Sequence, residues 1–485
     1  MSKMIYNVED KPRIASSIAG GFQHLLSIVA ATILVPILIG LPNQISAALL
    51  GCGLGSIVYI LITKRKSPVI VSSNFAFIGA LAMAYTGYGY LGILLGGLFT
   101  GGVYVVLSII IHFVGTKWIN KIFPPIIIGP VVALIGLTLA GSAITDLVSA
   151  NGYYFVNDSG AVHPYNLLAL LCGLVTFLVT IVFSVQNRFK KLKMVPFLLG
   201  ILAGYLVALG FTLIGRATNI QYMMILNFDP LIDNFKNLSI FSFVDYPRFA
   251  LLEGIKEITS GQVRLTGIGV AEIALAFIPI SLVSFSEHIA DHKNLSNIIG
   301  RDLVEGEPGL SRTIMGDGLG SITGTFFGIC PNTTYGETVG CIAITKDGSI
   351  QTILTACIMC IVLAFLSPLI AFFRTIPTCV IGGMCLVLYA FIAVSGFKMI
   401  QPVDLNVPKN LFTLSVILIA GIGGLTLQIP YQLGVLDGTS FVGPARFVTI
   451  STIAMALLLG MLTYDICSLV EKHNLPEENP DEEQK

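Results

Sequence analysis

Two acidic residues, Glu287 and Glu337, lie in stretches of this chain that are otherwise apolar enough to cross a membrane. Placing an ionisable side chain in the middle of a bilayer costs about 2.5–3.5 kcal/mol on insertion scales, and such residues usually mark a substrate or proton pathway. A carboxylate in a low-dielectric site can accept hydrogen bonds from a ligand and can also bind a proton. We therefore treat both glutamates as candidate ligand-binding groups.

Each glutamate has neighbours with complementary chemistry. A polar interruption of one apolar stretch at residues 72–74 is followed by Phe75, and a second interruption at 331–334 is followed closely by Gly336. If the two interruptions face each other, Phe75 can lie beside both glutamates. Backbone N–H groups that have left helix hydrogen bonding, such as that of Gly336, would then be available as donors.

This set of groups favours one class of ligand. Two hydrogen-bond-accepting acids, a few backbone donors and an aromatic face suit a flat, neutral heterocycle with ring N–H donors and carbonyl acceptors. A sugar would need many hydroxyl partners, and an inorganic anion would be repelled by the carboxylates. A simple cation would suit the acids but has less use for the ring.

Simpler structural roles are open for each polar residue. Asp291 follows Glu287 by one helical turn on the same face, where it is a second proton-linked acid or a solvated residue at the helix end. Asp317 is a proton-linked group or a buried polar contact between helices. His24 and His288 fit hydrogen bonds between neighbouring helices better than ligand contact. The two glutamates could themselves be a helix–helix polar pair.

The composition bounds the class of protein. Of 485 residues, 54% are apolar and 11% charged, the mean hydropathy is +0.86, and there are 50 glycines, against about 25% charged residues in an average soluble domain. These values indicate a polytopic helical membrane protein in contact with a lipid bilayer. The net charge of zero gives no sign of a nucleic-acid partner. No metal cluster, cofactor motif or nucleophile–base set is recognisable, so we expect no enzyme, no metal and no cofactor.

About fourteen apolar segments are long enough to span a bilayer, which needs about 20 residues. They lie near residues 15–41, 45–63, 68–87, 90–115, 121–145, 165–185, 194–215, 265–290, 311–328, 330–345, 350–373, 377–398, 408–428 and 446–470. Lysine and arginine gather in alternate turns, which predicts that both termini are cytoplasmic. Arg374 is the exception, on a short outer turn, and the acidic tail is expected to be a solvated end.

The two halves of the chain resemble each other. Gln-His at 23–24 corresponds to Glu-His at 287–288, and the pattern Pro-x-x-x-Ile-Gly occurs at 124–129 and at 377–382. The polar interruptions fall in the third and tenth segments. A seven-segment repeat has an odd count, so its second copy must be inverted, and inverted repeats with discontinuous helices are typical of transporters.

At these residues the chain resembles the nucleobase–ascorbate transporter family, and within it the bacterial uracil permeases. The resemblance spans about residues 10–470. It rests on Gln23-His24, Ser73-Asn74-Phe75-Ala76-Phe77, Ser286-Glu287-His288-Ile289, Pro331-Asn332-Thr333-Thr334-Tyr335-Gly336-Glu337 and Ala343-Ile344-Thr345-Lys346.

The resemblance implies a mainly α-helical fold of fourteen transmembrane segments in a 7+7 inverted repeat, with short strands in segments 3 and 10. Such proteins commonly act as homodimers. Glu287 and Glu337 would hold the base, Phe75 would stack on it, and Gly336 would offer its N–H. The implied parts are a cytoplasmic N-terminus (1–14), a core domain (15–115 and 263–374), a gate domain with an outer loop (116–262 and 375–470) and a cytoplasmic acidic tail (471–485).

Two departures bear on the substrate. The uracil-type pattern has His where Asp291 stands, and usually Asn where Thr338 stands. Asp291 together with Asp317 resembles the purine-transporting branch, whereas a glutamate rather than glutamine at 337 resembles the uracil branch. We expect a plasma-membrane symporter of a nucleobase and a proton that works by alternating access. Uracil is favoured over xanthine or another purine base, and an anion exchanger on the same architecture is the alternative from another class.

Overall fold

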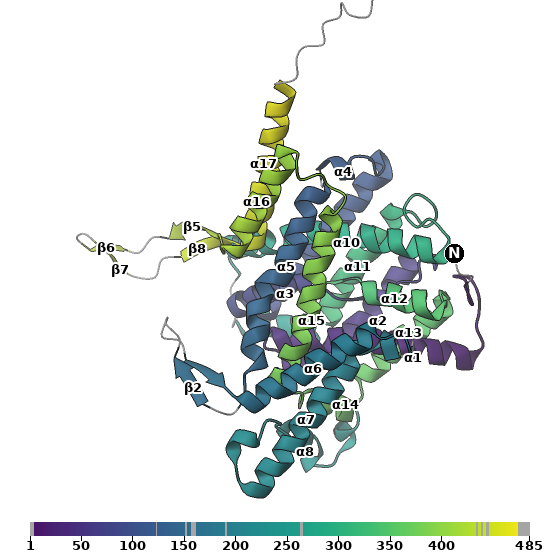
Figure 1. The fold of residues 1–485 in the computed structure, drawn as a ribbon, viewed down its shortest axis with the longest axis vertical. Coiled ribbons are helices and arrows are strands. Elements are labelled where there is room, and N and C mark those ends of the chain that lie inside the picture. Colours follow the sequence, from purple (N-terminus) through teal and green to yellow (C-terminus); the bar gives the residue numbers. More distant parts are fainter. Residues whose placement is uncertain are drawn as a thin grey trace, which may run out of the picture. The chain divides into compact units, whose positions relative to one another are not determined.

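The computed structural model describes residues 4–122, 124–150, 153–156, 162–189, 192–261, 265–432, 435–437, 440–442 and 446–473 (Figure 1). The chain falls into two compact units. Unit 1 is Met1–Thr116 with Leu139–Ala390, and unit 2 is Lys117–Thr138 with Phe391–Lys485. The expected core and gate domains divide the chain at other positions, and that division stays a prediction. The acidic tail lies outside the described residues from 474 onward.

Unit 1 consists mainly of helices (Figure 1). Its long helices are α1 (Ile14–Leu38), α2 (Ile45–Ile62), α3 (Ile78–Val114), α6 (Leu167–Val185), α7 (Pro196–Thr218), α10 (Gly267–Ile299), α11 (Leu310–Phe327) and α13 (Ile350–Ala364). Shorter helices are α8 (Asp229–Lys236), α9 (Ala250–Ser260), α12 (Gly336–Thr345) and α14 (Ser367–Phe373). Strands β2 (Tyr153–Val156) and β3 (Val162–Tyr165) form an antiparallel pair.

Unit 2 contains α4 (Ile119–Ile122), α16 (Pro408–Ile422) and α17 (Thr452–His473). Strands β5 (Leu427–Gln432) and β8 (Arg446–Ile450) pair antiparallel, as do β6 (Val435–Asp437) and β7 (Ser440–Val442). Helices α5 (Pro125–Leu147) and α15 (Thr378–Ile400) each run from one unit into the other.

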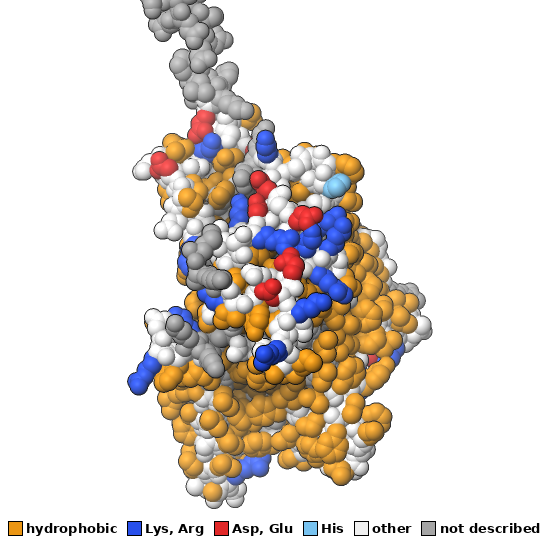
Figure 2. All heavy atoms as spheres, turned by 90° about the vertical axis from the view of Figure 1, so that its right-hand side faces the viewer, with side chains coloured by type: hydrophobic (Ala, Val, Ile, Leu, Met, Phe, Trp, Pro, Cys, Tyr) orange, Lys and Arg blue, Asp and Glu red, His pale blue; other side chains and the backbone are white. Residues whose placement is uncertain are grey.

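The length and composition of the helices make this a polytopic membrane protein. Among the described residues, nine helical segments are long and apolar enough to cross a bilayer: α1, α2 with the turn before it, α3 with the turn before it, α5, α6, α7, α10, α15 and α17. Two shorter apolar helices are α13 and α16. Figure 2 shows apolar side chains covering much of one face, crossed by a band of basic and acidic residues. Each predicted segment contains helix, but the count of fourteen crossings and the inverted repeat stay predictions.

Helix boundaries follow from short polar residues and glycine. The side chains of Asn166, Thr266 and Ser349 accept hydrogen bonds from the first backbone N–H groups of α6, α10 and α13, which is the preferred way to satisfy these donors. Helix α10 ends at Gly300, whose φ of 69° is the left-handed conformation that favours glycine at this position. As a result α10 continues nine residues beyond the expected boundary at 290, which changes the environment of Asp291.

Helices α2 and α11 pack so closely that glycine is required between them. A Cβ atom on Gly51 would lie 2.5 Å from the Gly324 carbonyl oxygen, and one on Gly55 would lie 2.7 Å from that of Gly320. Small residues let helix backbones approach in membrane proteins, where apolar burial alone gives little drive for association. This tight pair forms one side of the frame around the two short strands described next.

Strands β1 (Val71–Ser73) and β4 (Asn332–Thr334) lie at the two polar interruptions and pair antiparallel, with Ser72 opposite Thr333. All six residues are buried. Non-helical backbone at membrane depth is tolerated only inside protein or along a cavity, because its polar groups need partners there. Helix α2 supplies one such partner, since the Ser56 hydroxyl donates to the Val71 carbonyl at 2.9 Å. In this antiparallel register the chain leaves β1 toward Phe75 at one end of the strand pair and leaves β4 toward Gly336 at the other end.

Candidate ligand-binding site

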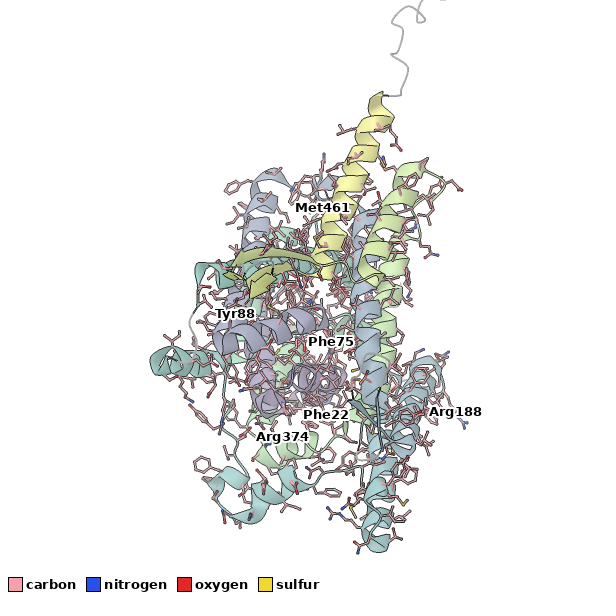
Figure 3. All side chains as sticks on the ribbon, turned by 90° about the vertical axis from the view of Figure 1, so that its left-hand side faces the viewer. Phe22, Phe75, Tyr88, Arg188, Arg374 and Met461 are labelled. Atoms are coloured by element: carbon pink, nitrogen blue, oxygen red, sulfur yellow. The ribbon has the colours of Figure 1, made fainter. Side chains whose placement is uncertain are left out.

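Phe75 lies directly after β1 and is 5% exposed, within the helices of unit 1 (Figure 3). The preceding residue, Asn74, fixes this position with both ends of its amide. Its Oδ1 accepts from the Ala76 backbone N–H at 2.8 Å, and its Nδ2 donates to Ser284 Oγ on α10 at 2.8 Å. The aromatic residue is thus tied to the helix that carries Glu287.

Glu287 lies in the middle of α10, three residues after Ser284, and is half-buried. Within the described residues, no hydrogen bond to its carboxylate is found. Asp291 and Glu337 carry the charges that act on it electrostatically. Glu287 and Glu337, which lie in separate apolar stretches of the sequence, are therefore close enough in space to interact electrostatically. Asp291 interacts with both of them.

Glu337 is the second residue of α12, which starts immediately after β4. It is half-buried, and its carboxylate lies near its own backbone N–H. A negative charge in the first turn is favoured by the helix dipole. The first N–H groups of a helix have no acceptor within it, so Gly336 and Glu337 each present a backbone donor. Gly336 is exposed, which leaves room for a ligand beside it.

Asp291 belongs to the same cluster. Its Oδ2 accepts from Thr334 Oγ1 at 3.1 Å. A Cβ atom placed on Gly336 would lie 3.5 Å from Asp291 Oδ1. The Asp291 carboxylate therefore lies beside Gly336, whose backbone N–H is the predicted donor to the ligand. The possibility of a solvated residue at the helix end is wrong, because α10 runs on to Ile299 and Asp291 is half-buried inside it.

Asp317 and His288 form a separate, fully buried network. Asp317 Oδ2 is hydrogen-bonded to His288 Nδ1 at 2.7 Å and accepts from Thr333 Oγ1 at 3.1 Å. His288 Nε2 and Thr313 Oγ1 are 3.0 Å apart. These bonds join α10, α11 and β4, as expected for polar contacts between helices. Asp317 Oδ1 is buried without a hydrogen-bond partner in the described part of the chain.

A second buried chain of hydrogen bonds extends this network, and sequence reasoning missed it. The His292 ring stacks on His288 with centroids 4.0 Å apart. Its Nδ1 bonds the His288 carbonyl at 2.8 Å, and its Nε2 lies 2.7 Å from the Tyr59 hydroxyl, which is 2.8 Å from Ser67 Oγ. The spacing of His288 and His292 by one turn was visible in the sequence, but Tyr59 carried no signal.

His24 lies on α1 and is fully buried, and neither of its ring nitrogens has a hydrogen-bond partner among the described residues. The expected hydrogen bond between helices is therefore not found for this histidine. The described residues also contain no group of three or more His, Cys, Asp or Glu residues placed to hold a metal ion.

Within unit 1, then, Glu287, Asp291 and Glu337 interact electrostatically, Asp291 lies beside Gly336, and Phe75 follows β1, where Asn74 ties the chain to α10. The carboxylates can accept hydrogen bonds, the first turn of α12 can donate them, and Phe75 offers an aromatic face. Apolar helices long enough to cross a bilayer, together with buried non-helical strands and a cluster of acids, are typical of membrane transporters.

The family model described as "Permease family" (Xan_ur_permease) matches residues 15–429. The chain belongs to this permease family, which confirms the resemblance seen in the sequence motifs. The uracil permease of Bacillus caldolyticus is 36% identical over 433 residues, covering 88% of this chain and 90% of that protein. The uracil permeases of Bacillus subtilis (strain 168) and Escherichia coli (strain K12) are 33% and 32% identical, each over 88% of this chain and 91% and 90% of those proteins.

Solved structures show the fold at much lower identity. The murine solute carrier 26 family member A9 anion transporter superposes with a TM-score of 0.63 at 10% identity, covering 96% of this chain and 69% of that chain. The transmembrane domain of the cyanobacterial bicarbonate transporter BicA gives a TM-score of 0.56 at 14% identity, covering 95% of this chain and all of that one. Identity this low makes the similarity one of fold alone.

Proposed function

We propose that this chain transports uracil, together with a proton, across the plasma membrane by alternating access. The observation that carries the proposal is the pair Glu287 and Glu337: both are half-buried and neither receives a hydrogen bond from another described side chain or backbone group. Uracil presents two ring N–H donors and two carbonyl acceptors in one plane. The glutamates would accept from the N–H groups, and the first-turn N–H groups of α12 would donate to the carbonyls. The relatives named uracil permeases support this choice of base.

The proton is proposed from the charge of the cluster. Glu287, Asp291 and Glu337 act on one another electrostatically, and like charges gathered in a poorly solvated site favour uptake of a proton by one of them. Glu287 is the leading candidate because the other two carboxylates both act on it, and Asp291 is the second. Asp317 is a further candidate, since an ionised oxygen buried without a partner is costly.

Uptake of labelled uracil into proteoliposomes under an imposed inward pH gradient tests the proposal. We expect the gradient to drive accumulation and a protonophore to abolish it. Uptake that is indifferent to both would exclude proton coupling while leaving uracil transport intact. Uptake that follows a sodium gradient instead would assign coupling to that ion.

Glu337→Gln tests the substrate contact, with Glu305→Gln as a matched control in an exposed loop. A hydrogen bond to a charged partner contributes about 1.5–3 kcal/mol, so we expect uracil uptake at low concentration to fall about 10- to 150-fold in Glu337→Gln. Glu305→Gln should transport normally. Equal uptake by both variants would remove Glu337 from the site.

A purine base is the second candidate substrate, and Asp291 favours it. Its carboxylate lies beside Gly336 and could accept from a further N–H that a purine carries and uracil lacks. Competition of labelled uracil uptake by thymine, xanthine, uric acid and hypoxanthine separates the two. Stronger competition by xanthine than by unlabelled uracil would favour the purine. Anion exchange receives support from the shared fold alone, and three carboxylates at the site would repel an anion.

The remaining expectations belong to the same proposal. Movement of the predicted core domain (15–115 and 263–374) against the predicted gate domain (116–262 and 375–470) would alternate access to the site. Both termini would be cytoplasmic, and the working form would be a homodimer. Labelling of single cysteines introduced near residues 10 and 470, in intact cells and in inverted vesicles, tests the placement of the termini.

A further inference from the structure

A polar pocket lies in unit 1, and none of the candidate site residues lines it. Its volume is about 320 Å³, and its polar lining includes Arg248, Arg374, Asp245, Asn43 and Asn234. The pocket lies where the loops around α8 and α14 meet. Nothing in the transport proposal uses it.

The frame of the pocket is held by hydrogen bonds between these loops. Asn234 Nδ2 donates to the Ser242 carbonyl at 2.8 Å, and Asn234 Oδ1 accepts from Ser367 Oγ at 2.6 Å. The Asp245 backbone N–H donates to the Phe365 carbonyl at 2.9 Å. The segment before Arg248 is thereby tied to the start of α14, whose end carries Arg374.

The two arginines have no partner of their own. Both are exposed, and within the described residues neither guanidinium makes an ion pair or a hydrogen bond. Asp245 is the one acidic residue of the lining, so two positive charges and one negative charge leave a net charge of +1. Arg374 also breaks the distribution of basic residues along the sequence, since it falls on a predicted outer turn. An arginine on an outer turn runs against that tendency.

Large apolar side chains project beside the pocket. In the segment 238–246, Leu238 is 75% exposed, Ile240 72%, Phe241 70% and Tyr246 64%. Such side chains next to basic residues are typical of protein that lies in the headgroup region of a bilayer. The same segment contributes Tyr246 to the pocket lining, so the apolar surface and the arginines adjoin.

We propose that Arg248 and Arg374 bind the phosphate group of an anionic phospholipid, with the segment 238–246 embedded in the headgroup region beside it. Arginine suits phosphate because its planar guanidinium donates two parallel hydrogen bonds. A phosphodiester carries one negative charge, which matches the net charge of the pocket. A phosphate monoester carries more charge and would have to overcome Asp245. The lipid would thus hold the α8 and α14 loops at the membrane surface.

The test measures how lipids protect the purified full-length protein against heat in detergent. Phosphatidylglycerol, phosphatidylcholine and phosphatidylethanolamine with the same acyl chains are added in separate arms, and inorganic phosphate in a fourth. We expect phosphatidylglycerol to raise Tm more than either zwitterionic lipid and inorganic phosphate to have little effect. Titration should give an apparent affinity for phosphatidylglycerol that falls about fivefold for each arginine removed, the effect of one basic residue near an anionic surface.

Arg248→Gln, Arg374→Gln and the double variant remove the pocket charges, and Arg188→Gln removes an equal charge from an exposed arginine outside the pocket. Figure 3 labels Arg188 and Arg374 in different parts of the structure. The preference for phosphatidylglycerol should disappear in the double variant and persist in Arg188→Gln. If the double variant does not fold, the single variants and the wild-type lipid series still decide the question.

Three outcomes would overturn the proposal. One is equal protection of the wild type by phosphatidylglycerol and phosphatidylcholine. Another is full protection by inorganic phosphate, which would assign the pocket to a soluble anion. The third is a change from dimer to monomer in the double variant with no lipid preference in the wild type, which would assign the segment to a contact between copies of the chain. Uracil uptake under a pH gradient is scored separately, so failure here leaves the transport proposal untouched.

Discussion

Asp317 on α11 and the pair Glu287 and Glu337 are acids in the same unit, but their surroundings differ. Asp317 is fully buried and bonded to His288 and Thr333. The two glutamates are half-buried and receive no hydrogen bond from other described residues. A buried polar group normally has a partner because leaving it unpaired costs about 1–3 kcal/mol.

This difference separates two roles that look identical in the sequence. An acid with side-chain partners on two other elements holds those elements and its own helix together. An acid in a partly buried site without protein partners is available for a molecule that the protein does not itself supply. Loss of the first kind should therefore affect folding, and loss of the second kind should affect ligand binding while the fold persists.

The largest effect is expected for Asp317→Ala. Removing one partner of a buried, hydrogen-bonded pair costs about 3–5 kcal/mol of stability, here because His288 and Thr333 would both lose their acceptor. Size-exclusion profiles and thermal unfolding of the purified protein in detergent measure the loss. Thr313→Val, which removes the outer bond to His288 and a bond to the Leu310 carbonyl within α11 but leaves Asp317 in place, should cost about 1 kcal/mol. If Asp317→Ala left the Tm unchanged but abolished proton-driven uptake, Asp317 would act in transport, like the two glutamates, and not in holding the fold together.

The next effect concerns protection by substrate. A ligand present at a hundred times its dissociation constant stabilises the folded state by about 2.7 kcal/mol. Saturating uracil should therefore raise the Tm of the wild type clearly, and Glu287→Gln and Glu337→Gln should lose most of this shift. Without uracil, both variants should unfold within about 0.5 kcal/mol of the wild type, as ordinary substitutions outside the packing network do.

The opposite pattern would break the comparison. Glutamine variants that unfold much more readily without ligand, yet keep the uracil-induced shift, would make the glutamates a structural helix–helix pair, the alternative that the sequence left open. Asp317→Ala serves as the reference for what a structural loss looks like in the same assay.

The sequence was sufficient to predict the family and a polytopic membrane protein. The convergence of Phe75 with the two glutamates on one ligand stays a prediction. An acid in an apolar stretch is costly, so its position alone carries information. The pairing of Asp317 with His288 could not be predicted in the same way. It depends on which faces of α10 and α11 meet, and the partners lie 29 residues apart.

The position of Asp291 shows a different limit. Its place on the face of Glu287 followed from helical spacing, but the helix end was expected too early because the apolar run stops near residue 290. Polar residues continue α10 to Gly300, where a left-handed glycine ends it. The bond to Thr334 then places Asp291 beside Gly336, which spacing along one helix cannot reveal.

A smaller effect is expected for Thr334→Val, because Asp291 is intermediate between the two kinds of acid. It has one partner, Thr334 Oγ1, and one oxygen that faces Gly336. Removing the hydroxyl should cost about 1 kcal/mol of stability and leave Asp291 freer to bind a ligand N–H. Competition assays should show a shift of preference toward bases with more N–H donors. Thr323→Val, on α11 with its hydroxyl bonded only to its own helix, is the matched control and should leave the preference unchanged.

The smallest effect concerns an acid bonded to backbone outside the spanning helices. Glu257 on α9 accepts from the N–H groups of Tyr90 and Leu91 at 2.8 and 3.3 Å, next to Gly89, whose φ of 58° breaks α3. Partial burial raises the pKa of Glu257 above its usual value. The folded protein therefore holds this proton at a pH where the unfolded chain has lost it, so the contribution of Glu257 to stability falls as pH rises through that window.

Glu257→Gln removes the titration but keeps an acceptor, so its Tm should depend less on pH than that of the wild type. Glu257→Ala should in addition lose about 1 kcal/mol, the value of a side chain that caps a helix start. If the Tm of the wild type and that of Glu257→Gln depended on pH in the same way, the titration of Glu257 would not affect stability. The hydrogen bonds from Glu257 to the backbone would then have a structural role alone, like those of Asp317.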